Sequence, residues 1–331
     1  MTNLTLLAAL ILALLTGLGA LATGSAAGRW VVLGHGIVGL AVLLLTPWKS
    51  VVVRRGLRRT GTSRWISVLL GVLVAISIGT GLASSTGLAR SIGGQHTMWV
   101  HIAASVALLP LLVWHVVVRR PRPRAVDLSR RTLLRTGALG VTAAALYGVV
   151  EATTRLADWP GSRRRFTGSH EIGSFDPTSM PSTIWLNDTV PHIVGDQWRL
   201  EVTDASSLRS FTLADLPNAR VTRRATLDCT SGWFAQQDWT GVPVAALLDD
   251  VGAARSLRVQ SVTGYWIRFP IEDVDSLLLA TGVGGAPLAR RHGFPARLVA
   301  PRRRGFWWVK WVERIEVDDA PPWWQPPFPL A

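Results

Sequence analysis

The sequence predicts two parts: an N-terminal all-α bundle of about five transmembrane helices and a C-terminal, strand-rich α+β domain. Of its 331 residues, 48% are hydrophobic and 17% are charged, and the mean hydropathy is +0.28. Soluble domains usually contain about 25% charged residues, so a fully soluble enzyme is not expected. The net charge of +14 is uneven: residues 1–158 hold 16 Arg and Lys against 3 Asp and Glu, whereas residues 159–331 hold 19 against 18. Positive charge between apolar runs indicates membrane topology rather than a nucleic-acid partner.

Five apolar runs in the first half of the chain are predicted membrane spans. The first, Leu4–Ala22, is long enough to cross a bilayer at about 1.5 Å per residue. It has no basic segment before it, which favours an anchor over a cleaved signal peptide. The other runs are Trp30–Trp48, Trp65–Ala83, Thr97–Val118 and Thr136–Val150. We expect residues 1–120 to form a four-span bundle and residues 121–158 to hold a basic cytoplasmic loop and the fifth span.

Two basic segments determine the predicted orientation of the spans. One lies between the second and third spans and the other between the fourth and fifth, whereas the remaining loops contain single arginines, Arg29 and Arg90. Loops rich in Arg and Lys stay in the cytoplasm. The chain is therefore expected to be a multi-pass protein of the cytoplasmic membrane, with its C-terminal domain on the extracytoplasmic side.

A candidate export signal precedes the fifth span, which is short and rich in Gly and Ala. Residues Ser129–Leu134 read Ser-Arg-Arg-Thr-Leu-Leu and look like a twin-arginine export signal placed inside the chain. That route exports domains already folded around a cofactor. The alternative is an ordinary positive flank on a membrane helix, because paired arginines are common in this chain. No clear cleavage site follows, so we expect the domain to stay tethered.

Ionisable groups within membrane spans are costly and suggest a function, and two of the histidines in the predicted spans are candidate ligands. His35 follows Arg29 by six residues in the second span, and His101 follows Gln95 by six residues in the fourth. Both spans run from outside to inside, so the two imidazoles should reach a similar depth. Two facing histidines suit axial ligation of a haem b iron. The alternative is a pair of interfacial histidines that hydrogen-bond carbonyl groups or water.

Residues 159–331 change from long apolar runs to short alternating ones. The segments Trp198–Val202 and Ser256–Val262 alternate apolar and polar residues, which predicts half-buried strands. Short helices are expected at Val244–Val251 and Ile271–Thr281. A mixed domain of this length can bury a core of its own.

The single cysteine, Cys229, ends an apolar stretch just before a Gly-containing turn. One cysteine forms neither an internal disulfide nor a Cys-rich metal cluster. A lone thiol in an oxidising compartment is a liability unless it is used. A soft thiolate suits a transition metal, whose binding keeps the sulfur deprotonated. A buried structural cysteine is the alternative interpretation.

Motifs around and beyond Cys229 point to a known family. Trp233 lies in the same turn, and four further segments follow in order: Trp239–Val244, Gly285–Leu288, Arg291–Pro301 and Gly305–Val312. This ordered run resembles the sulfite-oxidase-type molybdopterin oxidoreductases, and Trp185–Asp188 is a weaker match. The resemblance covers about residues 170–320. It implies one molybdenum on one pyranopterin dithiolene, with a protein thiolate as a further ligand.

The resemblance implies roles for individual residues. Cys229 would ligate molybdenum, His292 and Arg297 would hold the pterin and its phosphate, and Lys310 would bind the cofactor. Arg and Lys suit phosphate by charge, and Gly allows backbone N–H groups to approach it. The loop that wraps the cofactor would consist of Gly305, Phe306, Trp307 and Trp308.

Other residues near these motifs have less definite roles. Asn187, in the weaker match, would bind the cofactor, and Tyr265 is a catalytic candidate at the substrate pocket. For Arg302–Arg304, a solvated basic turn and a phosphate-binding role are both open.

The sequence departs from sulfite oxidases at two places. Leu186 stands where their anion-binding arginine is expected, and no tyrosine follows the Lys310-Trp311 motif. The domain looks nearer to the periplasmic methionine-sulfoxide reductases, although Ser231 stands where they have an acidic residue. Those enzymes pair with a separate haem-bearing membrane subunit, whereas here a membrane part is joined to the same chain.

These observations predict a membrane-tethered molybdenum-dependent oxidoreductase that transfers an oxygen atom, with two electrons, to or from a small-molecule substrate. Electrons would be exchanged with the quinone pool through haem b. A non-catalytic binding or assembly protein that keeps the fold is the main alternative. A transporter is disfavoured, because the spans are few, contain no acidic residue apart from the terminal Glu151 and show no inverted repeat.

Overall fold

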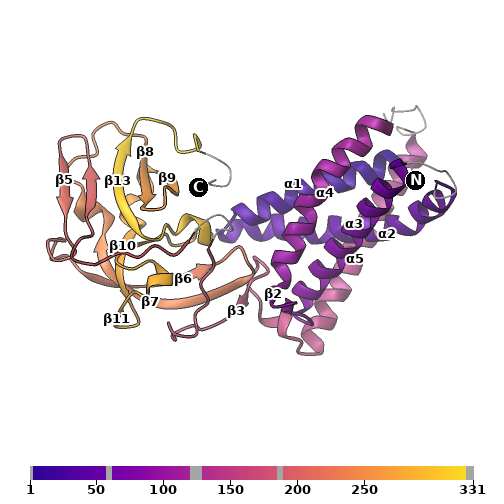
Figure 1. The fold of residues 1–331 in the computed structure, drawn as a ribbon. Coiled ribbons are helices and arrows are strands. Elements are labelled where there is room, and N and C mark those ends of the chain that lie inside the picture. The colour runs from indigo at the N-terminus through magenta and orange to yellow at the C-terminus, as the bar shows by residue number, and fades with distance from the viewer. Residues whose placement is uncertain (1–2, 57–61, 120–128, 185–188, 326–331) are drawn as a thin grey trace. The chain divides into compact units, whose positions relative to one another are not determined.

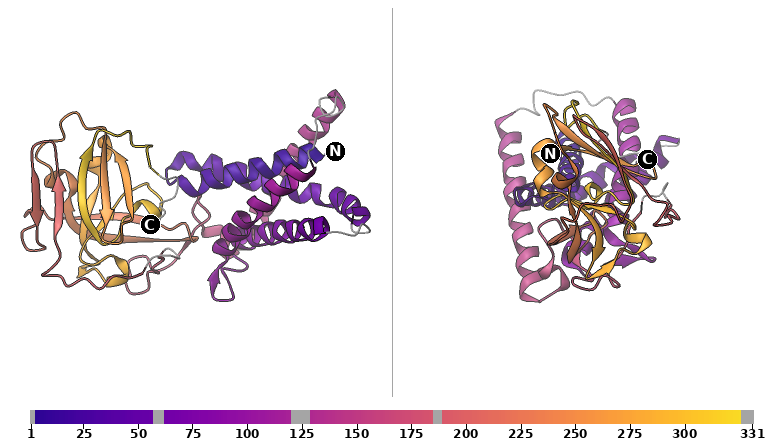
Figure 2. Two further views of the ribbon diagram at one scale, coloured as in Figure 1. Left: turned by 45° about the horizontal axis from the view of Figure 1, so that its top comes forward. Right: turned by 90° about the vertical axis from the view of Figure 1, so that its left-hand side faces the viewer.

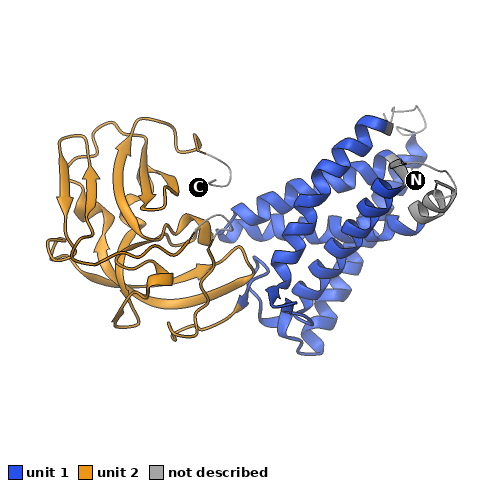
Figure 3. Cartoon of the chain, in the orientation of Figure 1, with its two compact units in different colours: residues 1–170 blue, residues 171–331 orange. Residues whose placement is uncertain are grey.

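The computed structural model describes residues 3–56, 62–119, 129–184 and 189–325 (Figure 1). The chain divides into two compact units, residues 1–170 and residues 171–331 (Figure 3). Asn187 and parts of the two predicted basic loops, residues 57–61 and 120–128, lie outside the described residues.

The first unit is built from five long helices that pack alongside one another (Figure 2). They are α1 (Asn3–Ala22), α2 (Arg29–Gly56), α3 (Thr62–Thr86), α4 (Thr97–Arg119) and α5 (Arg130–Leu156). Each is long and apolar enough to cross a membrane. The short elements of this unit are η1 (Ala26–Gly28), the hairpin β1 (Ser91–Ile92) and β2 (Gln95–His96), and η3 (Pro160–Arg163). The prediction of about five apolar helices is confirmed.

The fifth helix is longer than predicted. The apolar run Thr136–Val150 is short, but α5 contains 27 residues. Its N-terminus is capped by Ser129, whose hydroxyl accepts a hydrogen bond from the backbone N–H of Thr132 at 3.3 Å. Arg130 and Arg131 therefore lie in the first turn of the helix. The helix begins directly after the cap, six residues before the first residue of the apolar run Thr136–Val150.

The helices leave large apolar side chains on their outer surfaces. Leu15, Trp30, Val106 and Val141 are each more than half exposed. Inside, α1 packs against α2, α3 against α4, and α5 against α2. Apolar side chains in such numbers on the outside are unusual in soluble proteins and are typical of a lipid-facing surface.

The second unit contains two sheets around one core. In the first sheet the order is β11 (Ala286–Pro287), β10 (Leu278–Val283), β7 (Trp233–Pro243) and β3 (His170–Glu171), with β12 (Arg297–Val299) paired to β10 and β6 (Val221–Asp228) paired to β7. In the second the order is β5 (Leu208–Phe211), β4 (Leu200–Thr203), β13 (Val312–Asp318), β8 (Ser256–Ser261) and β9 (Trp266–Pro270). The pairing of β4 with β13 is parallel, whereas the pairings of β10 with β11, β12 and β7, of β6 with β7, of β4 with β5 and of β8 with β13 and β9 are antiparallel. The prediction of a strand-rich α+β domain is confirmed.

The two predicted strands are present as β4 and β8, but the two predicted helices are wrong. Residues Val244–Leu247 (η4) and Ile271–Ser276 (η5) form short 3-10 turns, and after η5 the chain enters β10. In β10, Leu279 pairs with Val242 on one side and Leu298 on the other, and it is fully buried. A short apolar run fits a buried strand as well as a buried helix, and here the neighbouring strands decide.

Candidate functional site

Cys229 lies in the tight turn that joins β6 to β7. Its backbone N–H donates to the carbonyl of Trp233 at 2.8 Å, and its own carbonyl accepts a hydrogen bond from Gly232 at 3.2 Å. Gly232 has a φ of 95°, a left-handed conformation that suits glycine. Cys229 is 8% exposed. The turn therefore fixes one nearly buried thiol at the end of the sheet.

The loop before η7 (Gly305–Trp307) lies directly against this turn. Arg304 Nη1 is 2.5 Å from Asp228 Oδ1, and each of these side chains is 3% exposed. Arg304 Nη2 also donates to the Cys229 carbonyl at 3.2 Å. A Cβ added at Gly305 would lie 3.0 Å from the Cα of Cys229. A buried ion pair and a close backbone approach thus hold the predicted wrapping loop against the predicted metal ligand.

Arg297 is almost completely buried, with 1% of its surface exposed. Its guanidinium carbon lies 5.0 Å from the ring centroid of Trp239 and 5.6 Å from that of Trp308. Burial lowers the pKa of Arg297 to about 9, an effect that the nearby Cys229 partly opposes. Its Nη1 and Nη2 donate to the carbonyls of His292 at 3.2 Å and Trp308 at 3.4 Å, whereas in the described part of the chain its Nε has no hydrogen-bond partner. A buried cation with an unused donor suits a bound anion.

His292 and Lys310 lie next to Arg297. A Cβ added at Gly293 would be 2.9 Å from the Cβ of Arg297 and 3.2 Å from that of Lys310. Burial, followed by the positive charges of Arg297 and Lys310, lowers the pKa of His292 to about 4. The structure therefore brings the three predicted phosphate-binding residues into one positively charged cluster.

The polar groups of this cluster also hold the segment that precedes the undescribed residues 185–188. His292 Nε2 is 3.1 Å from the carbonyl of Met180. Lys310 Nζ donates to the carbonyl of Thr183 at 2.8 Å and to Ser182 Oγ at 3.2 Å. Residues 180–183 are thereby attached to the predicted cofactor-binding residues.

The remaining predicted site residues brace the wrapping loop. Tyr265 is buried, and its hydroxyl donates to the carbonyl of Phe306. Trp307 packs edge-on against Phe269, with ring centroids 5.1 Å apart. Trp308 is nearly fully buried beside Arg297. The role of Tyr265 at a substrate pocket stays a prediction.

The arginines of Arg302–Arg304 have three different environments. Arg302 is exposed, which agrees with a solvated basic turn. Arg303 pairs with Asp273 and lies over the ring of Trp307 at 4.7 Å. Arg304 is buried against Asp228. Neither alternative from the sequence describes Arg304, because its partner is 76 residues away in the chain.

Sequence reasoning missed Asp228 and Thr183, and it did not foresee the ion pair of Arg304. One signal was available for Asp228, since it lies directly before the candidate ligand Cys229 and a carboxylate needs a partner when it is buried. No local pattern marked Thr183, which contacts the site only through tertiary packing.

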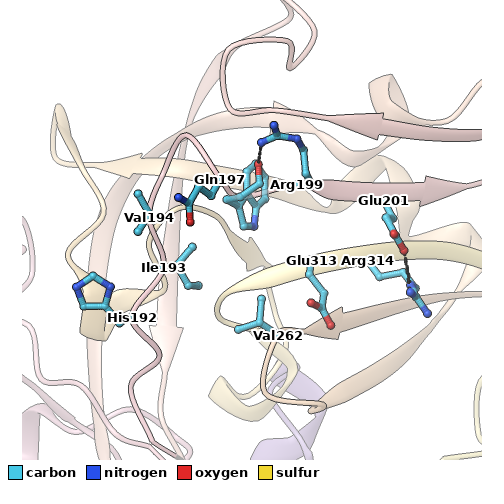
Figure 4. A pocket seen from close by; sticks show the side chains of 10 residues that line it. His192, Ile193, Val194, Gln197, Arg199, Glu201, Val262, Glu313 and Arg314 are labelled. Carbon is cyan, nitrogen blue, oxygen red and sulfur yellow. Dashed lines mark hydrogen bonds and ion pairs between the residues drawn. The ribbon is translucent and has the colours of Figure 1, made fainter.

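A separate cavity of about 410 Å³ lies elsewhere in the second unit (Figure 4). It is lined by His192, Ile193, Val194, Gln197, Trp198, Arg199, Glu201, Val262, Glu313 and Arg314. Glu201 and Arg314 form an ion pair of 2.7 Å on its wall. None of the predicted cofactor-binding residues lines this cavity.

In the first unit, the two predicted haem ligands face each other. The ring centroids of His35 on α2 and His101 on α4 are 5.9 Å apart. When two imidazoles bind opposite sides of one metal ion through bonds of about 2 Å, their ring centroids lie about 6 Å apart. His35 Nδ1 is 3.0 Å from the carbonyl of Ala13, and His101 Nδ1 is 2.7 Å from that of Ser77. Bonding through Nδ1 leaves Nε2 of each ring as the nitrogen that could bind a metal.

Comparison with known proteins identifies the second unit. Residues 187–324 match the family described as oxidoreductase molybdopterin binding domain. These residues form a molybdopterin-binding oxidoreductase domain. The match contains Cys229, His292, Arg297 and Lys310. The prediction of a molybdenum-dependent oxidoreductase domain of the sulfite-oxidase type is confirmed.

Three relatives illustrate the similarity. The catalytic subunit MsrP of the protein-methionine-sulfoxide reductase from Gluconobacter oxydans is 27% identical over 245 residues, which cover 60% of this chain and 72% of that protein. A protein designated YedZ1 from Azospira oryzae is 28% identical over 146 residues, 41% of this chain and 55% of that protein. A nitrate reductase from Mycosarcoma maydis is 40% identical over 57 residues, 17% of this chain and 6% of that protein. The chain thus spans widely different shares of its relatives, and the predicted likeness to the methionine-sulfoxide reductases is confirmed.

Replacing Arg304 by Gln should destabilise the second unit by about 3–5 kcal/mol, because the buried Asp228 carboxylate loses its cation. Denaturant unfolding of the full chain in detergent measures this loss. The double variant Asp228→Asn, Arg304→Gln should recover much of it, since no uncompensated charge stays buried. Arg302→Gln changes an exposed arginine of the same turn and serves as the control. An Arg304→Gln variant as stable as this control would contradict the role of the ion pair.

The low pKa of His292 should make the stability of the cofactor-free protein depend on pH. In the folded state its imidazole stays neutral down to about pH 4, whereas the unfolded chain binds the proton below about pH 6.5. The stability that depends on the neutral imidazole is fully present above pH 6.5 and decreases as the pH falls toward 4. At pH 5 the free energy of unfolding should be lower by about 2 kcal/mol. His292→Asn should therefore flatten the unfolding free energy between pH 7 and pH 5, and the exposed His192→Asn should not. An unchanged slope in His292→Asn would assign the effect to another group.

Proposed function

We propose that this chain is a membrane-tethered, molybdopterin-dependent oxidoreductase that performs two-electron oxygen-atom transfer on a small molecule outside the cytoplasmic membrane. The observation that supports it best is the pairing of a fixed, nearly buried thiol with a positively charged cluster in one domain. Cys229 supplies the thiolate, and Arg297 supplies a buried cation with an unused donor. Molybdopterin combines a thiolate-binding metal with a phosphate, so the residues present fit the cofactor.

Each proposed cofactor contact has a definite residue. Cys229 would ligate the metal, while His292, Arg297, Lys310 and Asn187 would hold the pterin and its phosphate. When bound, the cofactor supplies the two-electron redox chemistry at molybdenum. The loop residues that would enclose it are Gly305, Phe306, Trp307 and Trp308.

The chain itself contributes position and exclusion of water. Arg304 fixes the backbone carbonyl of Cys229. Trp239 and Trp308 enclose the guanidinium of Arg297, and a charged donor that is shielded from water binds an anion more strongly. Tyr265 is proposed to line the substrate pocket.

The apolar helices support anchoring in the membrane. We propose that the second unit lies on the extracytoplasmic side, as the distribution of arginine between the loops predicts, and that the Arg130-Arg131 pair at the start of α5 acts in export. His35 and His101 would hold one haem b, through which electrons are exchanged between the quinone pool and the molybdenum site. The separation of 5.9 Å between their rings supports this assignment. Gly17 and Gly81 let the two imidazoles pack against the neighbouring helices, because an added Cβ would lie 3.1 Å from the ring of His35 and 3.2 Å from that of His101.

A non-catalytic binding or assembly protein with the same fold is the competing proposal. A scaffold needs only the fold. The fixed thiol and the buried Arg297 would bind the cofactor in an enzyme, whereas in a scaffold the burial of Arg297 would only cost free energy. Molybdenum analysis separates the two.

Full-length protein purified from cells that make the cofactor should contain close to one molybdenum per chain. Cys229→Ser should abolish turnover without unfolding the domain, because the alcohol is a much poorer metal ligand than a thiolate. Thr230→Ser, at the next position, is the matched control. Absence of molybdenum from the wild type would refute the enzyme proposal, and full turnover in Cys229→Ser would refute the ligand assignment.

The membrane unit should show the absorption spectrum of a bis-histidine haem b. His35→Ala and His101→Ala should each abolish it, because axial ligation needs both imidazoles. His115→Ala, on the same helix as His101, is the control and should leave the spectrum unchanged. A wild-type spectrum without haem bands, or one unaffected by both substitutions, would remove haem from the proposal.

A further inference from the structure

We propose that Ser231 is a positioning residue that donates a hydrogen bond to the sulfur of Cys229 and thereby raises the reduction potential of the metal site on that thiolate. The inference rests on the proposed function, because it takes Cys229 as the molybdenum ligand. Ser231, with Thr183 and Trp233 behind it, would influence the potential of the metal without binding the metal directly.

The contact itself is short and buried. Ser231 Oγ lies 3.1 Å from Cys229 Sγ, and Ser231 is fully buried. The two residues belong to one turn, which the bond from the Cys229 N–H to the Trp233 carbonyl closes at 2.8 Å. The backbone therefore fixes the serine relative to the thiol, and no rotation of a flexible loop is needed to form the bond.

The hydrogen bonds behind Ser231 run in one direction. A metal-bound thiolate has no proton and can only accept, so the single hydroxyl proton of Ser231 goes to sulfur. The hydroxyl of Thr183, 3.1 Å from that of Ser231, is then the donor to it. Trp233 Nε1 can only donate, and it lies 3.2 Å from Thr183 Oγ1. The result is a relay from the indole N–H through two hydroxyl groups to the sulfur.

The relay is attached to the positively charged cluster. Lys310 Nζ donates to the carbonyl of Thr183 at 2.8 Å. The lysine proposed to bind the cofactor therefore also fixes the residue that supports Ser231. Hydrogen bonds in series polarise one another inside a protein, so the terminal bond to sulfur is stronger than that of an isolated serine.

Such a bond has a predictable effect on redox chemistry. A hydrogen bond to a ligating sulfur withdraws negative charge and favours the more reduced, more negative state of the site. Loss of one bond to a charged acceptor should shift the equilibrium between oxidation states about tenfold. For a one-electron couple, this equals about 59 mV toward lower potential.

The test is a redox titration of the molybdenum-loaded full chain, followed by the Mo(V) electron paramagnetic resonance signal. Ser231→Ala should lower the midpoint potential by about 59 mV, which corresponds to the tenfold change in the equilibrium between oxidation states. Thr183→Val keeps the shape of threonine but removes the second hydroxyl, and it should lower the potential by a smaller amount. Thr183→Ser keeps the hydroxyl and should titrate like the wild type.

The outcomes separate this inference from the proposed function. Wild-type protein without molybdenum would refute the proposed function itself. Full molybdenum content with an unchanged potential in Ser231→Ala would overturn the role of Ser231 alone. If Ser231→Ala loses the metal, Thr183→Val decides, because it leaves Ser231 in place: an unchanged potential there overturns the relay, and a lowered one supports it.

Discussion

The buried ion pair between Asp228 and Arg304 is the constraint on which the site depends. It joins the end of β6 to the loop before η7 across 76 residues of sequence. Two charges withdrawn from water are stable only when each satisfies the other and the remaining hydrogen bonds are made. Arg304 meets this condition by also binding the carbonyl of Cys229, so the wrapping loop has one position relative to the thiol. The position of Gly305 beside the Cα of Cys229 follows from this attachment.

A second unit that is almost neutral overall nevertheless concentrates positive charge at one place. Arg297 lies between two tryptophans without a carboxylate among the described residues, and Lys310 and a neutral His292 adjoin it. Other arginines of this unit, among them Arg209, Arg224 and Arg258, lie in ion pairs with carboxylates. Arg297 donates from Nη1 and Nη2 to the carbonyls of His292 and Trp308, but its Nε has no partner, so the free energy lost by burying it is only partly recovered, and a bound anion would recover more. The same logic applies to His35 and His101, whose Nδ1 atoms are satisfied by carbonyl groups and whose Nε2 atoms can face a metal.

The fold was predictable wherever one physical property acts over a long segment. Five apolar runs were enough to locate α1 to α5, because hydropathy over about 20 residues reflects transfer into a bilayer. Alternation was enough for β4 and β8. The predictions failed where the decisive contacts were with distant strands: Leu278–Val283 has no pattern that distinguishes helix from strand, and its pairing with β7 and β12 makes it a strand. The length of α5 was also underestimated, since a cap at Ser129 is visible only once the backbone turns there.

The sequence by itself determined the division into two parts, the single thiol and the cationic residues of the cofactor motif. These depend on composition, on residue type and on spacing within about 20 positions. Only the tertiary structure decided that Arg304 belongs to Asp228 rather than to a phosphate or to solvent, and that Thr183 lies between Trp233 and Ser231. Those contacts join residues 48 to 76 positions apart. Hydrogen bonds and ion pairs act over a few ångströms, so their partners are fixed by the packing of the sheets and by nothing in the local sequence.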